Sequence, residues 1–524
     1  MLLFGWTGTL VACLAAIALS FLLVYWTPYW RRADMDIMMV YQAFLVNSGH
    51  AQDFFDHPGH LHVLLISAWF KLLHGIGFLD IITLADMPPA SDVANFEQVW
   101  TAAVRAGRLL SLAIVSALIV AFAFLLRRLV TDWRIAALGT FMFAFSSGVM
   151  WHAHVLRTDM LAAGLEILGL LLLLSAARSS QSNWRPVVIG VAAMLCTLGV
   201  VNKVQALLPA VAWTVVVMFF GIRSNEHATL WRSPARVAVA LATLATLALL
   251  AAIPVADLIH VGFSAKASSV FLLPPPPFGI SGLYQALLAG WICGAVVIFA
   301  LIWRVPFLET LATVFAVALG VAAGLLSLKL LYHPQSIIEV VNPLELMLFF
   351  ASWADPQLAG KPFASTQLLQ SLSLGFLDVL ARLTFVLHTS TRATVFLQWV
   401  AIAGICLAWV RGQRGLAAQV AILVATAWGI DTVGSLRGLK LEYSVFGDPI
   451  IVVAAAWLLA NLPELREHRL AFPLGVVLIA AHLVLSQIEP VKLAIGRPNP
   501  EAHCEWLPRY TKLIERFPFC PPQS

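Results

Sequence analysis

Long apolar runs separated by short polar segments form the dominant pattern of this chain. A helix that crosses a membrane needs roughly 20 mostly apolar residues. Because lipid offers no hydrogen-bond partners, runs of this length inside a bilayer fold as helices. The pattern therefore predicts about thirteen spans, at 2–27, 108–126, 135–151, 160–177, 186–201, 205–222, 236–258, 284–302, 307–330, 393–410, 415–433, 449–461 and 471–487.

Composition supports an all-α polytopic membrane protein. Hydrophobic residues make up 60% of the 524 positions and charged residues only 11%, whereas a soluble domain is about half apolar and about a quarter charged. The net charge of +5 is too small to favour a nucleic-acid partner. The first apolar run has no basic n-region and no small-residue cleavage site, so we interpret it as a retained helix.

Arginine placement predicts the orientation of the chain. If the N-terminus is cytoplasmic, every loop assigned to the cytoplasm is basic and nearly free of acids, as cytoplasmic loops of membrane proteins are. These loops hold Arg127, Arg128, Arg134, Arg178, Arg185, Arg223, Arg232, Arg236, Arg304, Arg411, Arg414, Arg466 and Arg469. We therefore expect an inner (plasma) membrane protein whose C-terminus lies on the periplasmic side.

The predicted outside loops are longer and carry both charges. A transmembrane domain at 1–490 would include the first periplasmic loop, 28–107, and a second large one, 331–392; a periplasmic tail would follow at 491–524. Apolar segments at 61–73, 343–353 and 367–386 are too short to span and predict interfacial helices. In the tail, Cys504 and Cys520 are either a disulfide, which this compartment favours, or two free thiols.

One polar segment, 30–62, is denser in ionisable groups than any other stretch. Asp34 and Asp36 come directly after the first span, and a carboxylate partly removed from water can act as a general base toward an acceptor hydroxyl or amine. The alternatives are solvated loop acids or, less favoured, ligands for a divalent metal. His57 follows Asp56 in a Pro-Gly turn, where it could donate to a phosphate or a sugar hydroxyl while Asp56 caps the next helix.

Several cations lie at the predicted outside ends of spans. Arg157 either pairs with Asp159 or reaches a lipid phosphate. A lysine at the depth of Lys203 is costly without an anion, so Lys203 is predicted to contact a phosphate, the alternative being that it snorkels to the interface. Guanidinium and ammonium groups stabilise a departing phosphate, although each residue alone is also typical of interface anchoring. The further candidates for substrate binding are His333, Arg437, Lys440 and Tyr443.

These motifs together resemble the GT-C superfamily of membrane glycosyltransferases, and most closely the lipid A aminoarabinose transferases and protein O-mannosyltransferases. The matching text is Asp34-Met-Asp36, Tyr41-Gln-Ala43, Asp56-His57-Pro58-Gly59, Arg157-Thr-Asp159, Gly199 to Lys203, and Tyr443 before Pro449. Two positions depart from the family pattern: the usual Asp-Glu pair is Asp-x-Asp, and the second proline of the turn is Gly59. Either aspartate could match the family's base, and we favour Asp36 because it is nearer to Tyr41.

The resemblance implies an enzyme that moves a sugar from a polyprenyl-phosphate donor to an envelope acceptor, which could be lipid A or core, a polysaccharide or a protein. Transfer would be inverting and periplasmic, with an aspartate as base and no required metal, because cations alone can stabilise a monophosphate leaving group. The main competing class is a transporter or flippase for a lipid-linked or anionic substrate. It would favour ionisable groups in broken helices near the midplane. A scaffold without chemistry is a third reading.

Overall fold

The computed structural model describes residues 5–32, 35–50, 52, 59–179, 184–223, 234–266, 283–330, 365–383, 394–435, 441–462, 471–496, 500–505, 507–514 and 516–520. Within these ranges the chain forms helices and no strand. The first half contains α1 (Trp6–Tyr25), η2 (Tyr29–Arg32), α2 (Asp36–Asn47), α3 (His60–Gly75), α4 (Val93–Leu129), α5 (Trp133–Ala144), α6 (Ser147–His152), α7 (Thr158–Arg178), α8 (Arg185–Asn202), η3 (Val204–Ala206) and α9 (Leu207–Met218).

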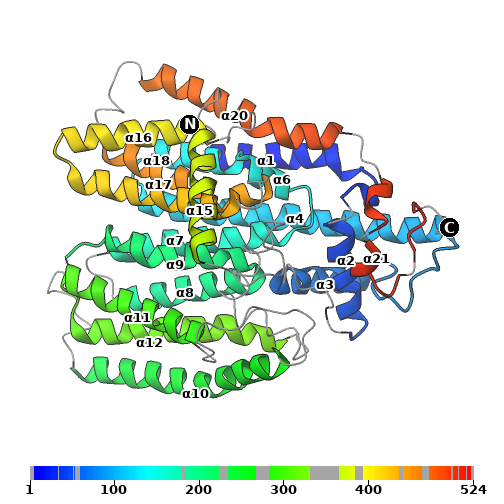
Figure 1. The fold of residues 1–524 in the computed structure, drawn as a ribbon, viewed down its shortest axis with the longest axis horizontal. Coiled ribbons are helices and arrows are strands. Elements are labelled where there is room, and N and C mark those ends of the chain that lie inside the picture. Colours follow the sequence, from blue (N-terminus) through cyan, green and yellow to red (C-terminus); the bar gives the residue numbers. More distant parts are fainter. Residues whose placement is uncertain are drawn as a thin grey trace.

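The second half continues the bundle and ends in a short C-terminal segment. It contains α10 (Pro234–Lys266), α11 (Leu283–Trp303), α12 (Phe307–Leu326), η6 (Ser327–Leu330), α15 (Ser365–Ala381), α16 (Val395–Val410), α17 (Arg414–Ser435), η7 (Leu441–Tyr443), α18 (Ser444–Asn461), α20 (Ala471–Ile495), η8 (Pro500–His503) and α21 (Leu507–Tyr510). The long helices lie roughly side by side, and α2, α3 and α21 gather at one end of them (Figure 1).

Nine helices in the described part of the chain are long and apolar enough to cross a membrane, so the protein is a polytopic helical membrane protein. The predicted count of thirteen is not confirmed. The predicted spans at 135–151, 205–222, 393–410 and 471–487 correspond to shorter apolar helices. The first of them breaks at Phe145 and Ser146, between α5 and α6. A 12-residue helix such as α5 is only about 18 Å long, against a hydrocarbon core of about 30 Å.

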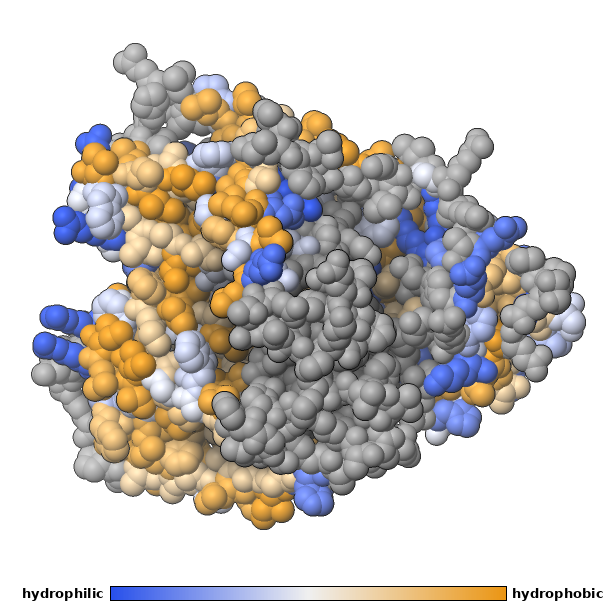
Figure 2. Space-filling model, in the orientation of Figure 1, coloured by the Kyte–Doolittle hydropathy of each residue, from blue (hydrophilic) through white to orange (hydrophobic). Residues whose placement is uncertain are grey.

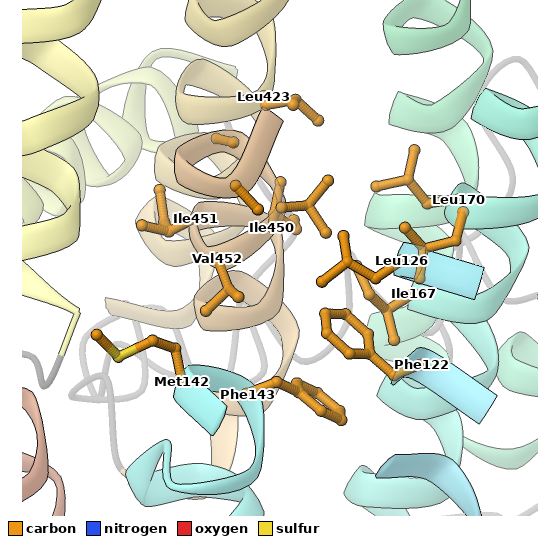
Figure 3. Close-up of a cluster of buried hydrophobic side chains, with 14 of the residues drawn as sticks. Phe122, Leu126, Met142, Phe143, Ile167, Leu170, Leu423, Ile450, Ile451 and Val452 are labelled. Atoms are coloured by element: carbon orange, nitrogen blue, oxygen red, sulfur yellow. The ribbon is translucent and has the colours of Figure 1, made fainter. Parts of the chain in front are cut away.

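The centre of the bundle is packed with aliphatic and aromatic side chains from α4, α5, α7, α17 and α18 (Figure 3). Phe122 and Phe143 stack with ring centroids 4.1 Å apart. Both α7 and α18 are buried over most of their length, and a helix that is apolar all round belongs in the interior of a bundle. Polar residues described below lie at the N-terminal end of α7 and in η7, directly before α18.

Two of the basic residues assigned to one side of the membrane, Arg178 and Arg185, lie at helix ends away from those polar residues. Arg178 lies over the ring of Trp457 at one end of α18, and Arg185 pairs with Glu309 at 3.1 Å. In Figure 2 hydrophobic residues cover the flank of the bundle, and hydrophilic residues lie at its left edge, where helices end. Arg178 and Arg185 therefore lie at the opposite end of α7 and α8 from Asp159 and Lys203.

Outside the bundle, α3 and α15 confirm helices at the segments predicted as 61–73 and 367–386, while 343–353 lies outside the described residues. The predicted loop 28–107 is largely helical, because α4 begins at Val93 and extends well beyond the apolar run. A disulfide joins Cys504 to Cys520, as the sequence suggested.

Candidate functional site

Asp36 is fully buried and paired with an arginine from α4. Its Oδ2 accepts from Arg108 Nη2 at 2.7 Å and from Nε at 2.9 Å. Arg108 Nη1 also donates to the Thr27 carbonyl and hydroxyl, both at 3.0 Å. Both partners of the ion pair have no exposed side-chain surface, so the pair locks the start of α2 onto α4 and onto the end of α1.

The second oxygen of Asp36 holds the segment that leads into α7. Its Oδ1 accepts from the backbone N–H of Leu156 at 2.9 Å. The next residue, Arg157, has an extended backbone, and α7 begins directly after it. Asp36 therefore fixes the position from which Arg157 and Asp159 project.

Four charged side chains form a second buried cluster, which we call the ionic cluster: Arg157, Asp159, Lys203 and Glu442. Arg157 Nε lies 2.7 Å from Asp159 Oδ2, and its Nη2 lies 3.3 Å from Glu442 Oε1. Lys203 Nζ lies 3.3 Å from Asp159 Oδ1. The cluster joins the N-terminal end of α7, the break between α8 and η3, and η7. Since it has two cations and two acids, their formal charges cancel.

Burial and neighbouring charges set the protonation of this region. Burial acts to lower the pKa of Arg157, but the carboxylates of Asp159 and Glu442 raise it above its ordinary value. The guanidinium therefore stays charged. Burial lowers the pKa of His62 to about 4 and that of His152 to about 4, against a smaller upward effect of Asp159 on each. Both imidazoles are therefore neutral at pH 7.

Gly59, one of the two departures from the family pattern, has a local structural reason. It precedes α3 with φ of +55°, in the left-handed region. Its N–H donates to the carbonyl of Asn202 at 2.9 Å. A proline has no N–H and its φ is fixed near −65°, so it could make neither feature. Glycine here attaches α3 to the end of α8, next to Lys203.

The structure brings together five of the residues predicted from sequence and leaves one apart. Asp36, Arg157, Asp159 and Lys203 are connected through the contacts above, and Tyr443 is close enough to influence the pKa of Arg157. Tyr41 lies elsewhere, fully buried in an apolar core, where its hydroxyl accepts from the Leu513 N–H at 3.1 Å. The remaining predicted residues lie outside the described part of the chain: Asp34, His57, His333, Arg437 and Lys440.

Three charged residues that make contacts in the structure were not predicted as such from the sequence. Arg108 is the first residue of the predicted span 108–126, and an arginine at the start of an apolar run signals a buried partner. Glu442 was not singled out beside Lys440 and Tyr443. Glu166, fully buried in α7, accepts from Trp213 Nε1 at 3.0 Å. An acid within an apolar run was a visible signal for this contact.

Within the described residues, no group of three or more His, Cys, Asp or Glu side chains gathers as metal ligands would. No family model, characterised protein or solved structure was found to match this chain. The resemblance to GT-C enzymes thus rests on the motifs alone.

Proposed function

We propose that this protein is a glycosyltransferase that moves a sugar from a polyprenyl-phosphate donor to an envelope acceptor at the extracytoplasmic face of the inner membrane. The observation that carries the proposal is the ionic cluster. Four charged groups converge at one end of apolar spans, the level at which the headgroup of a lipid would lie. Burying such charges in a membrane protein is costly, and they typically mark substrate sites.

The proposed reaction is a single displacement at the anomeric carbon. An acceptor oxygen forms the new bond to this carbon as the bond to the lipid phosphate oxygen breaks. The acceptor proton passes to a carboxylate, and the phosphate leaves with the electron pair. The negative charge that develops on the phosphate needs cations nearby.

The two aspartates take different parts in this proposal. Asp36 already accepts two bonds from Arg108 and one from Leu156, which suits a positioning residue more than a base. We therefore assign the base role to Asp34, the alternative that the sequence leaves open. Asp36 would hold the Leu156–Arg157 segment in the place that catalysis requires.

We assign phosphate binding to two cations that are close to Glu442 of the ionic cluster in the sequence. Arg157 and Lys203 are each paired with an acid, so the carboxylates partly neutralise their positive charge. Lys440 is two residues before Glu442, a chain distance of at most roughly 7 Å, and Arg437 precedes it. In the proposal these two residues receive the leaving phosphate, with His333 as a further donor.

The test is sugar transfer by the purified full-length protein in detergent, with radiolabelled polyprenyl-phosphate sugars and cell-envelope extract. We expect Asp34→Asn to abolish transfer while leaving the protein folded. Asp80→Asn, at an exposed acid of the same loop, is the matched control and should transfer at the wild-type rate. Transfer that persists in Asp34→Asn would remove the base assignment, and no transfer by the wild type from any donor would remove the proposed function.

One observation favours the competing transporter reading. Glu166 is fully buried within the span formed by α7, and ionisable residues inside spans mark ion or proton pathways in transporters. The two readings differ in their product. A flippase in proteoliposomes would move the labelled lipid between leaflets without forming a glycosidic bond, whereas the enzyme would form a labelled acceptor.

A further inference from the structure

Several buried polar atoms beside the ionic cluster have no hydrogen-bond partner. Neither ring nitrogen of His62 has a partner, and the same holds for His152 Nε2 and the Thr158 hydroxyl. All three side chains are at most 2% exposed. Folded proteins leave few buried polar groups unpaired, and each one needs an explanation such as a bound molecule.

These groups lie in one place, contributed by three elements. The His62 N–H donates to Asn202 Oδ1 at 3.0 Å, and Asn202 Nδ2 donates to the Thr158 carbonyl at 2.8 Å. The charge of His152 would act on His62, and the charge of Asp159 acts on both histidines. Asn202 therefore fastens the start of α3 to the start of α7, with both histidines beside Asp159.

The charge of this region selects the chemistry of a ligand. The formal charges of the ionic cluster cancel, and both histidines are neutral at pH 7 because burial holds each pKa at about 4. Such a site offers no net attraction to a phosphate. A neutral imidazole has one donor and one acceptor nitrogen, and the Thr158 hydroxyl both donates and accepts. Sugar hydroxyls offer the same combination.

We propose that His62, His152 and Thr158 form the subsite that binds the hydroxyl groups of the transferred sugar, next to Asp159. This inference rests on the proposed function. It adds that this site binds the neutral, hydroxylated sugar ring of the donor and not its phosphate. His62 and His152 are binding residues in this scheme, and the ionic cluster keeps their supporting segments in place.

The test compares a polyprenyl phosphate without a sugar and the same lipid with a sugar attached. Binding of a polyprenyl phosphate, and of the same lipid carrying mannose, glucose or galactose, is measured on the full-length protein in detergent. The dissociation constant of the lipid phosphate divided by that of the sugar-carrying lipid measures how much the sugar adds to the affinity. We expect His62→Asn and His152→Asn each to reduce this ratio by roughly three- to tenfold, the effect of one hydrogen bond, with little change for the lipid phosphate alone.

A matched control is His74→Asn, at the other end of the same helix, where the ring is exposed and bonds to the Leu79 carbonyl. It should leave the ratio unchanged. An unchanged ratio in both His62→Asn and His152→Asn, with wild-type lipid binding, would mean that only water satisfies these groups and would overturn the inference alone. If the wild type bound neither lipid, the inference and the proposed function would fall together. The melting temperature of each variant identifies any loss that comes from unfolding.

Discussion

The backbone N–H of Leu513 donates to the hydroxyl of Tyr41 at 3.1 Å, although the two residues are 472 positions apart. This contact attaches the C-terminal segment to α2, the helix that begins with Asp36. Phe517 packs against Trp100 with ring centroids 5.5 Å apart, within the same apolar core. The C-terminal segment therefore helps to hold α2 in place.

The first prediction concerns this hydrogen bond. Tyr41→Phe keeps the ring in its apolar surroundings but leaves the Leu513 N–H without its acceptor. We expect a loss of stability of about 0.5–1.5 kcal/mol, seen as a lower melting temperature in detergent. Transfer activity should fall by less than in Asp36→Asn, because the ion pair to Arg108 remains. A melting temperature equal to the wild type would show that water replaces the lost bond without cost.

The second prediction concerns the disulfide between Cys504 and Cys520. The bridge closes a loop with a sequence separation of 16, for which chain-entropy arguments give about 3 kcal/mol. Cys504→Ser with Cys520→Ser should lower the melting temperature and expose the tail to a protease added from the tail side. Cys406→Ser, at an exposed free cysteine in α16, is the control. Equal proteolysis of both proteins would show that apolar packing alone holds the tail.

The third prediction separates the two aspartates. Asp36→Asn leaves the Arg108 guanidinium buried without its counter-charge, and removing one partner of a buried ion pair costs about 3–5 kcal/mol. We expect poor folding or a clearly lower melting temperature. Asp34→Asn should instead remove activity with little loss of stability. A stable, inactive Asp36→Asn would return the base role to Asp36.

The sequence predicts the bundle well because the signal for a span is local. A run of about 20 apolar residues specifies a helix without knowledge of its neighbours. The pairing of Arg157 with Asp159 was also within reach, because the two residues are close in the chain and a charge beside lipid needs a partner. Lys203 was expected to need an anion for the same reason. The anion in the structure is Asp159, whereas the predicted phosphate contact stays a prediction.

The remaining features depend on contacts between distant residues. Asp36 and Arg108 are 72 positions apart, and no local pattern links them, so the sequence does not predict their ion pair. The hydrogen bond between the Leu513 N–H and Tyr41 likewise joins distant parts of the chain and leaves no local pattern. The helix breaks at Phe145 and Ser146, where Ser146-Ser147-Gly148 interrupts the apolar run. The predicted span 135–151 is too long because it runs through this polar signal.

The fourth prediction is a loss of stability in acid. Burial lowers the pKa of His60, His62 and His152 to about 4 each and that of His154 to about 3. Unfolded histidines titrate near 6.5, so between about pH 6.5 and pH 4 the unfolded chain binds more protons than the folded one. The contribution of these histidines to stability is therefore fully present above pH 6.5 and is lost as the pH is lowered through this window.

Melting temperatures measured from pH 8 to pH 4 check this dependence. His62→Asn removes one of the titrating groups and should make the fall in acid shallower, whereas the exposed His74→Asn should leave it unchanged. A melting temperature of the wild type that stays constant down to pH 4 would contradict the assignment of these histidines as buried and neutral.

The fifth prediction concerns the closest approach of two spans. In α12, a Cβ on Gly320 would collide with the carbonyl oxygen of Gly190 in α8, a backbone atom that cannot rotate away. Gly320→Ala should therefore push the helices apart and cost about 1–3 kcal/mol. Gly429→Ala in α17 is the matched control, since nothing lies within 4 Å of its added Cβ. It should gain up to about 1 kcal/mol from helix propensity. Equal melting temperatures for the two variants would contradict this packing.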